Sequence, residues 1–170
     1  FEVHGVWTRL NLGALQRPFM LLLFGPPSSG KTSLALEMLN DWPGPGLFLS
    51  GECGLGPSLR SIIAYREVFN FDLAAPVSRD DILDVTTRKK YSIVAVDSLS
   101  HMRLDPSTVR SEFLDQDTTV IAIAQVNSAG ESRGGVSAVH EADIVIKLEK
   151  YGVFETIKNR FGDLSKGSWL

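Results

Sequence analysis

The chain has 170 residues, of which 44% are hydrophobic and 22% are charged, and its formal net charge is −3. This length and composition are typical of one soluble globular domain that can bury a core without disulfides or metal ions. Its one cysteine, Cys53, excludes an internal disulfide, and its longest apolar run, residues 19–24, is too short to cross a bilayer.

The charge and the near absence of cysteine also bear on partners and compartment. An acidic chain argues against strong nonspecific nucleic-acid binding by a monomer, although a basic groove can still form between subunits. The lack of a signal-peptide pattern and of a disulfide framework fits a reducing compartment, so we expect a cytoplasmic protein with no membrane partner. We treat residues 1–170 as a single domain, with residues 1–17 as a lead-in segment.

Strands and helices are predicted to alternate along the chain. The apolar residues 19–24 predict a strand buried on both faces, and residues 31–39 predict a helix with one apolar face. Further predicted elements are a strand at 47–50, a helix at 57–68, and a helix at 81–87, at whose start Ser78 and Asp81 resemble a helix N-cap. A strand at 91–96, a helix at 106–114 and a strand at 118–124 come next, followed by a glycine- and serine-rich mobile loop at 127–140. The last two predicted strands, at 144–148 and 153–158, are joined by a turn at 150–152. This order predicts an α/β fold, in which helices flank a mostly parallel central sheet that ends in an antiparallel C-terminal hairpin.

A phosphate-binding loop is predicted between the first strand and the first long helix. The residues that match the pattern G-x-x-x-x-G-K-S/T are Gly25, Pro26, Pro27, Ser28, Ser29, Gly30, Lys31 and Thr32. In such loops, backbone N–H groups surround the phosphates, the lysine contacts the β- and γ-phosphates, and the hydroxyl ligates Mg²⁺. A glycine-rich turn can match this pattern by accident, but here a buried strand precedes it and a helix follows it. ATP and Mg²⁺ are therefore the expected ligands.

Three polar residues follow predicted strands, at the sheet edge where ligands bind in parallel α/β folds. Asp97 can hold Mg²⁺ beside Thr32, or it can cap the segment that follows. Glu52 can polarise a water for attack on the γ-phosphate, or it can be a solvated loop acid. Gln125 can contact the γ-phosphate, or it can simply end its strand.

Several short motifs resemble those of known ATPase families. They are Ser50-Gly51-Glu52, Ala95-Val96-Asp97-Ser98, Lys158-Asn159-Arg160-Phe161-Gly162, Gln125-Val126-Asn127 and Glu141-Ala142-Asp143-Ile144-Val145. The first three together resemble the bacterial RadA (Sms) branch of the RecA superfamily, and the last two are similar to the DnaB-type replicative helicase core. The resemblance covers residues 19–167 and implies a RecA-like P-loop ATPase.

The resemblance also implies roles for residues in the nucleotide site. It makes Glu52 the catalytic glutamate and places Gln125 as a γ-phosphate sensor, on a strand between the P-loop strand and the Asp97 strand. Lys158 and Arg160 would reach the nucleotide of the neighbouring subunit in a homo-oligomer, a hexameric ring or a filament, and stabilise charge there as an arginine finger does.

Contacts to single-stranded DNA follow from the same resemblance. The loops at residues 98–105 and 127–140 correspond to segments that face a central channel, which places Arg103 and Arg133 on DNA phosphates. RadA proteins also carry an N-terminal zinc module and a C-terminal Lon-like domain, and neither is in this sequence. We therefore expect a minimal core, either excised from a larger protein or encoded compactly, as in phages.

Three functions are compatible with these observations. The leading hypothesis is a DNA-dependent ATPase of the recombinase or branch-migration kind that hydrolyses ATP between subunits. The motor core of a replicative helicase is the second. The third is a nucleotide-switched regulatory module that binds a protein partner, which the acidic net charge supports.

Overall fold

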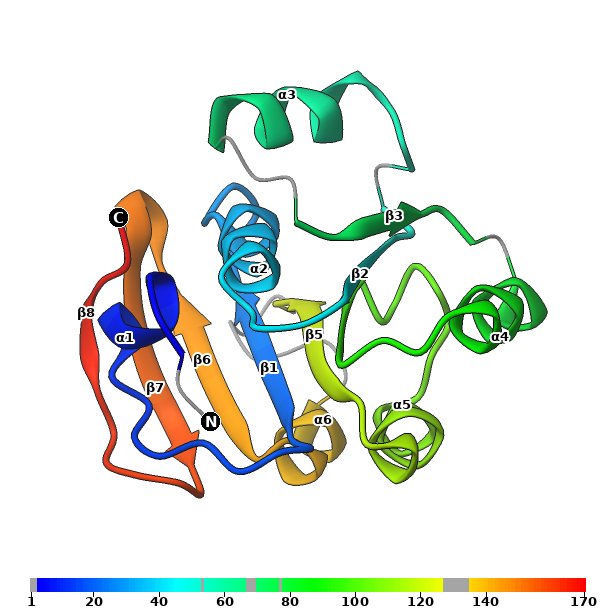
Figure 1. Ribbon diagram of the computed structural model, residues 1–170. Helices are drawn as coiled ribbons and strands as arrows, with labels where there is room; N and C mark the ends of the chain where they lie inside the picture. The colour runs from blue at the N-terminus through cyan, green and yellow to red at the C-terminus, as the bar shows by residue number, and fades with distance from the viewer. Residues whose placement is uncertain (1–2, 53, 67–69, 77, 127–134) are drawn as a thin grey trace.

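Helices cover both faces of a central sheet in the computed structural model, which describes residues 3–52, 54–66, 70–76, 78–126 and 135–170 (Figure 1). In chain order the elements are α1 (Val6–Leu10), β1 (Met20–Gly25), α2 (Lys31–Asn40), β2 (Gly46–Ser50), α3 (Pro57–Arg66), β3 (Asp72–Ala74), α4 (Arg79–Arg88), β4 (Ile93–Asp97), α5 (Pro106–Phe113), the 3₁₀ turn η1 (Leu114–Gln116), β5 (Thr119–Gln125), α6 (Gly135–Glu141), β6 (Ile144–Leu148), the 3₁₀ turn η2 (Lys150–Gly152), β7 (Val153–Asn159) and β8 (Lys166–Ser168). These elements confirm the predicted α/β architecture.

The sheet is parallel from β3 to β6 and antiparallel at its C-terminal end. The strand order is β3-β2-β4-β5-β1-β6-β7-β8. β5 lies between β1 and β4, as the family resemblance predicted, and β6 pairs with the other side of β1. Every residue of β1, β2 and β4 is buried, which explains why these strands are continuous apolar runs in the sequence.

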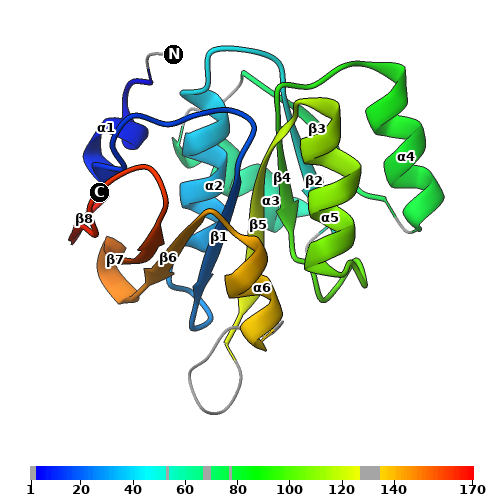
Figure 2. The same cartoon turned by 90° about the horizontal axis from the view of Figure 1, so that it is seen from below.

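Helices lie on both faces of the sheet (Figures 1 and 2), and an apolar core lies between the sheet and the helices on each face. On one face Leu21 and Leu23 of β1 pack with α1, α2 and α3. On the other face Met20 and Leu22 pack with α4, α5 and α6. Successive side chains of a strand point to opposite faces, so β1 contributes to both cores and anchors the loop that follows it.

Local sequence signals fix the starts of two helices. The Ser78 hydroxyl accepts a hydrogen bond from the backbone N–H of Asp81, and the Asp81 carboxylate accepts one from the backbone N–H of Ser78. Asp105 caps α5 in the same way by accepting from Ser107 N, with Pro106 in the first turn. The predicted cap at Ser78 is therefore confirmed.

Four elements differ from the prediction. The lead-in segment contains α1, whose residues Val6, Trp7 and Leu10 are buried. The strands β3 and β8, each three residues long, were not predicted. The predicted loop at residues 127–140 was wrong for its second part, because α6 begins at Gly135. Ala138 is fully buried against the second core, where a small side chain lets this short helix approach the sheet. Residues 127–134 lie outside the described part of the chain.

Candidate nucleotide site at the carboxyl edge of the sheet

The predicted phosphate-binding loop connects the carboxyl end of β1 to the start of α2. Ser28 and Gly30 adopt positive φ angles of 61° and 91°, so the backbone turns sharply before Lys31 opens the helix. Gly25 has no room for a side chain, because a Cβ there would collide with the backbone carbonyl of Leu148 on β6. The glycine spacing of the motif therefore follows from the close approach of the loop to β6 and from its left-handed turn.

Lys31 is folded back onto its own loop. Its Nζ donates to the carbonyl oxygens of Gly25 at 3.0 Å and Pro26 at 2.8 Å, and the residue is only 8% exposed. Burial lowers the pKa of Lys31, while the nearby carboxylates of Asp97 and Glu52 act in the opposite direction. The ammonium group thus sits at the mouth of the loop, where incoming phosphate oxygens would replace the two carbonyl oxygens as acceptors.

Asp97 and Thr32 meet across the sheet edge. The Thr32 hydroxyl donates to Asp97 Oδ2 at 2.7 Å, and Asp97 is 2% exposed. Burial raises the pKa of Asp97, although the hydrogen bond from Thr32 works against that shift. The Asp97–Ser98 peptide bond is cis. A buried carboxylate paired with a hydroxyl is the oxygen-rich donor set that Mg²⁺ takes beside a nucleotide.

Three of the four unpartnered buried side-chain atoms of the described residues belong to this loop or to residues next to it, and the fourth, of Thr119, lies at the start of β5. Within the described ranges, four buried side-chain atoms have no hydrogen-bond partner: Ser29 Oγ, Asp97 Oδ1, Thr119 Oγ1 and Trp169 Nε1. Ser29 and Asp97 belong to the candidate site itself, and the indole of Trp169 contacts Gly30. Buried polar groups usually have partners, so the free Asp97 oxygen fits a divalent cation and the free Ser29 hydroxyl fits a phosphate oxygen.

Glu52 and Gln125 form a second polar pair at the same edge. Gln125 Nε2 donates to Glu52 Oε1 at 3.2 Å, and the backbone N–H of Glu52 donates to the Asp97 carbonyl at 3.1 Å. Glu52 is exposed, and its charge acts on both Lys31 and Asp97. The structure therefore brings this solvent-facing carboxylate to the phosphate loop, next to the predicted Mg²⁺ ligands.

Lys158 and Arg160 lie at the opposite edge of the sheet. Arg160 Nη1 donates to Asp143 Oδ1 at 2.7 Å, and the backbone N–H of Asp143 donates to the carbonyl of Met20, the first residue of β1. At about 3.3 Å per residue, roughly 16 Å of β1 separates Met20 from Gly25. Arg160 is thus placed away from the phosphate loop of its own chain, which excludes a role in its own nucleotide site.

The two basic side chains are engaged within the chain. Lys158 Nζ donates to the carbonyls of Val139 and His140 at 2.8 and 2.9 Å, at the C-terminal end of α6. A cation there complements the negative end of the helix. Burial lowers the pKa of Lys158, and the neighbouring Arg160 lowers it further. Contact with another subunit would require both side chains to exchange these partners.

Asp143 organises the amino edge of the sheet, a role that was not predicted. It is 5% exposed and accepts hydrogen bonds from Met20 N at 3.0 Å, from Arg110 at 3.3 Å and from Arg160. One carboxylate thereby joins the starts of β1 and β6 to α5 and to the end of β7. The one sequence signal for this role is the position of Asp143, directly before the buried strand β6.

The two arginines predicted to contact DNA have different outcomes. Arg103 is exposed, has a φ of 52°, and lines a cavity of about 370 Å³ with Gly51, His101 and Met102 at the carboxyl edge. Arg133 lies outside the described residues. The DNA contact of Arg103 thus stays a prediction, at a position on the same edge as the phosphate loop.

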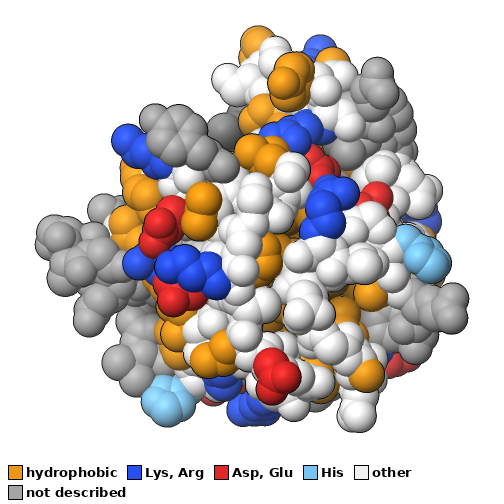
Figure 3. All heavy atoms as spheres, turned by 90° about the vertical axis from the view of Figure 1, so that its left-hand side faces the viewer, with side chains coloured by type: hydrophobic (Ala, Val, Ile, Leu, Met, Phe, Trp, Pro, Cys, Tyr) orange, Lys and Arg blue, Asp and Glu red, His pale blue; other side chains and the backbone are white. Residues whose placement is uncertain are grey.

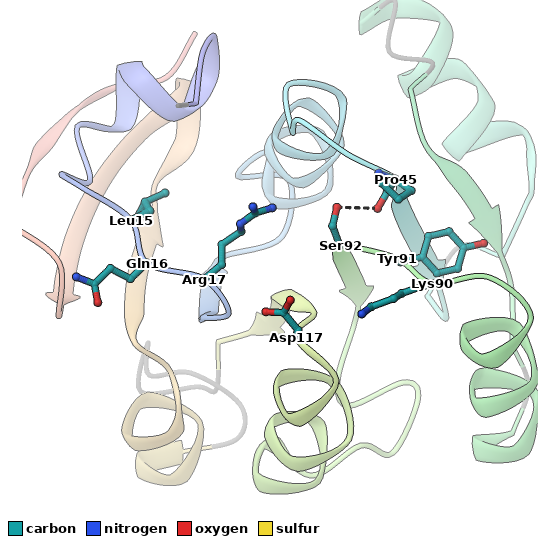
Figure 4. Close-up of a pocket in the computed structure, with 8 residues that line it drawn as sticks. All are labelled: Leu15, Gln16, Arg17, Pro45, Lys90, Tyr91, Ser92 and Asp117. Atoms are coloured by element: carbon teal, nitrogen blue, oxygen red, sulfur yellow. Dashed lines mark hydrogen bonds between the residues drawn. The ribbon is translucent and has the colours of Figure 1, made fainter. Parts of the chain in front are cut away.

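A larger cavity of about 620 Å³ lies at the other edge of the sheet (Figure 4). Its lining residues are residues 15–17, Pro45, residues 90–92 and Asp117. Each of these segments precedes a parallel strand, whereas ligands of parallel α/β sheets bind beyond the carboxyl ends. This cavity is therefore separate from the candidate nucleotide site.

Comparison with known proteins identifies the fold. No protein-family model matches the sequence, and no curated protein matches it. A solved structure described as an ATPase domain is similar, with a TM-score of 0.71 and 18% sequence identity over 98% of this chain and 88% of that one. The fold is that of a RecA-like P-loop NTPase. At this identity the similarity establishes the fold alone, so the finer resemblance to RadA rests on the sequence motifs.

Proposed function

We propose that this chain is a Mg²⁺-dependent ATPase that works as a homo-oligomer, a hexameric ring or a filament, on single-stranded DNA. The observation that carries the proposal is the convergence of Lys31, the Thr32–Asp97 pair and the Glu52–Gln125 pair at one edge of a RecA-like sheet. The description of the similar solved structure, an ATPase domain, supports the same activity.

The chemistry follows from where these side chains lie. Backbone N–H groups of the loop and the Lys31 ammonium bind the phosphates, with Lys31 released from the carbonyls of Gly25 and Pro26. Thr32 and Asp97 would hold Mg²⁺, which supplies positive charge to the phosphate oxygens. Glu52 accepts the proton of the water that attacks the γ-phosphorus, while the bond from that phosphorus to the bridging oxygen breaks and ADP leaves. Gln125 holds Glu52 in place and reaches the γ-phosphate.

A second subunit is needed to complete this site. Lys158 and Arg160 lie at the edge opposite their own phosphate loop, and a cationic group on the transferred phosphoryl is worth about 10³–10⁵ in rate. The carboxyl edge of one subunit would therefore meet the amino edge of the next. Such head-to-tail contacts close into rings or continue as filaments.

Mixing two inactive variants tests this arrangement. Lys31→Ala removes the phosphate contact and Arg160→Ala removes the trans cation, so each variant alone should show little turnover. When they are mixed, some interfaces combine an intact loop with an intact arginine, and ATPase activity should reappear. Two variants that remain inactive when mixed, although they co-assemble in sedimentation, would contradict action in trans.

DNA binding is proposed at the carboxyl edge beside Arg103. On the side of the molecule that carries α1 and β8, basic side chains lie next to acidic ones (Figure 3). The Nζ of Lys166, for example, lies 4.0 Å from a carboxylate oxygen of Glu155. Such mixed charge does not favour a polyanion there.

Salt dependence distinguishes a DNA motor from a nucleotide-switched module that binds protein. Affinity for an oligothymidylate should fall steeply between low and moderate salt, because phosphate contacts release counterions. Absence of binding at low salt would favour the switch module, which the net charge of −3 supports.

Two kinds of DNA motor fit these observations. The Lys158-to-Gly162 motif and Glu52 favour a RadA-like recombination or branch-migration ATPase. The Gln125 region and the segment from Glu141 to Val145 are similar to a replicative helicase core, which remains the alternative. Unwinding of a forked duplex by the assembled protein would favour the helicase, and extension of a pre-formed DNA branch without unwinding would favour the RadA-like enzyme.

A further inference from the structure

Trp169 lies directly behind the phosphate-binding loop. A Cβ placed on Gly30 would come within 2.9 Å of atom Cζ2 of the Trp169 indole, so the ring occupies the space that any larger residue at position 30 would need. Gly30 is the residue with φ of 91° that turns the loop into α2. The indole therefore fills the space on the core side of this turn.

The indole is held in place from several elements. Its residue follows β8, and its backbone N–H donates to the Gly152 carbonyl at 3.0 Å. Arg9 of α1 donates to the Trp169 carbonyl at 2.9 Å, and the guanidinium of Arg66 from α3 lies 5.0 Å from the ring centroid. Both arginines also bind Glu37 of α2, at 3.3 and 2.8 Å. Trp169 itself is 1% exposed, whereas the side chains of Arg9 and Arg66 that contact it are partly exposed.

Trp169 acts through the shape of its ring and not through its polar Nε1–H group. Among the described residues, no acceptor receives a hydrogen bond from Trp169 Nε1. Trp7 and Trp42 differ in this respect, since their Nε1 atoms donate to Met38 O at 2.8 Å and to Ser92 Oγ at 3.0 Å. The contribution of Trp169 is therefore the packing of its ring against Gly30, and phenylalanine can supply much of it.

We propose that Trp169 is a positioning residue for the phosphate-binding loop, and that it sets nucleotide affinity by holding the turn at Gly30 and Lys31 in its binding conformation. This inference rests on the proposed nucleotide site. A binding loop that is already ordered loses less conformational entropy when the ligand arrives. Removal of the ring leaves a space behind Gly30 into which the turn can relax, while Lys31, Thr32 and Asp97 all remain.

The test compares the affinity of three variants for ADP with MgCl₂, measured by calorimetry below the unfolding temperature of each. Trp169→Ala should weaken binding roughly 10- to 100-fold, because small displacements of positioned groups cost about that much. Trp169→Phe should stay close to wild type. Trp7→Ala is the matched control, because it removes an equally buried indole from the same apolar core. Trp7 bonds Met38 near the C-terminal end of α2, whereas Gly30 precedes the first residue of that helix. In turnover assays Trp169→Ala should raise KM for ATP and leave kcat nearly unchanged.

Equal affinity of wild type and Trp169→Ala would overturn the inference, and so would an equal loss in Trp7→Ala. Wild-type protein that binds no ADP would instead overturn the proposed nucleotide site and this inference with it.

A second measurement applies even if Trp169→Ala fails to fold. In the double variant Trp7→Phe/Trp42→Phe, Trp169 is the only tryptophan in the sequence. Its fluorescence should change on titration with ADP and MgCl₂, with the same midpoint as the calorimetric titration. Unchanged emission over a calorimetrically confirmed titration would contradict contact between the indole and the binding loop.

Discussion

Replacement of Asp97 by asparagine should raise stability and lower ATP hydrolysis together. Asp97 is 2% exposed, its Oδ1 has no partner among the described residues, and burial raises its pKa. Asparagine keeps the acceptor for Thr32 but removes the buried charge. The substitution relieves the cost of burying a charge, whereas the amide Nδ2 that takes the place of Oδ1 still lacks a partner and keeps part of that cost. A net recovery of about 1 kcal/mol is therefore expected. In a chain of this size that corresponds to an increase in Tm of about 2–4 °C.

The same substitution should lower ATP hydrolysis by about 10- to 100-fold or more, because it weakens the group that holds Mg²⁺. Thermal unfolding is measured in EDTA without nucleotide, and turnover is measured with excess Mg²⁺. Asp163→Asn is the control, since it removes the same charge from an exposed residue and should change neither quantity. A lower Tm for Asp97→Asn than for wild type in EDTA would refute the idea that the buried charge of Asp97 destabilises the fold when no cation is bound. Unchanged hydrolysis would refute the role of Asp97.

Three further predictions concern other side chains. Glu52→Gln keeps the contact with Gln125, so Mg²⁺-ATP binding should persist while the single-turnover hydrolysis rate falls roughly 10²–10⁴-fold. A hydrolysis rate of the variant equal to that of wild type would show that Glu52 is not the general base. Arg160→Ala removes a half-exposed guanidinium from the buried carboxylate of Asp143 and should cost about 1–3 kcal/mol in chemical denaturation. DNA-stimulated turnover should nevertheless collapse in the folded variant, and activity that survives would leave Arg160 with a structural role only. Burial raises the pKa of Glu37 in spite of two arginine neighbours. The ionised form of Glu37 therefore destabilises the fold at pH values above the unfolded-state pKa. This penalty disappears as the pH falls below the unfolded-state pKa, because Glu37 is then protonated in both states. The Tm of Glu37→Gln relative to wild type should therefore be more favourable at pH 7 than at pH 4, and the reverse order would show that the ion pairs outweigh burial.

The elements that the sequence predicted well carry local signals. Continuous apolar runs predicted β1 and β4 to within one or two residues, because strands of a parallel sheet are buried on both faces. The capping pair at Ser78 and Asp81 placed the start of α4. The phosphate loop was predictable because its function requires particular residues at a fixed spacing between a strand and a helix.

The elements that were missed depend on contacts between distant parts of the chain. α1 is only five residues long, and its apolar side chains are explained by the core they enter. α6 resembles a loop in composition, and only its packing against the sheet makes it helical. The contact of Trp169 with Gly30 and the bond from Met20 to Asp143 each join segments more than 100 residues apart. The hydrophobic periodicity of the sequence does not predict such contacts.

Lys158 and Arg160 show where motif reasoning stops. The motif predicted that both act on the nucleotide of a neighbouring subunit, and this role stays a prediction. The sequence did not indicate that both would be bound within the chain, to the end of α6 and to Asp143. Those partners depend on the antiparallel register of β7 with β6, which motif reasoning does not provide.

The steady-state ATPase rate with Mg²⁺, measured with and without single-stranded DNA over a range of protein concentrations, tests the central claim most directly. We expect a rate per chain that rises steeply with protein concentration, increases further with DNA, and is lost in Lys31→Ala. A rate per chain that is independent of both concentration and DNA would contradict an oligomeric DNA motor.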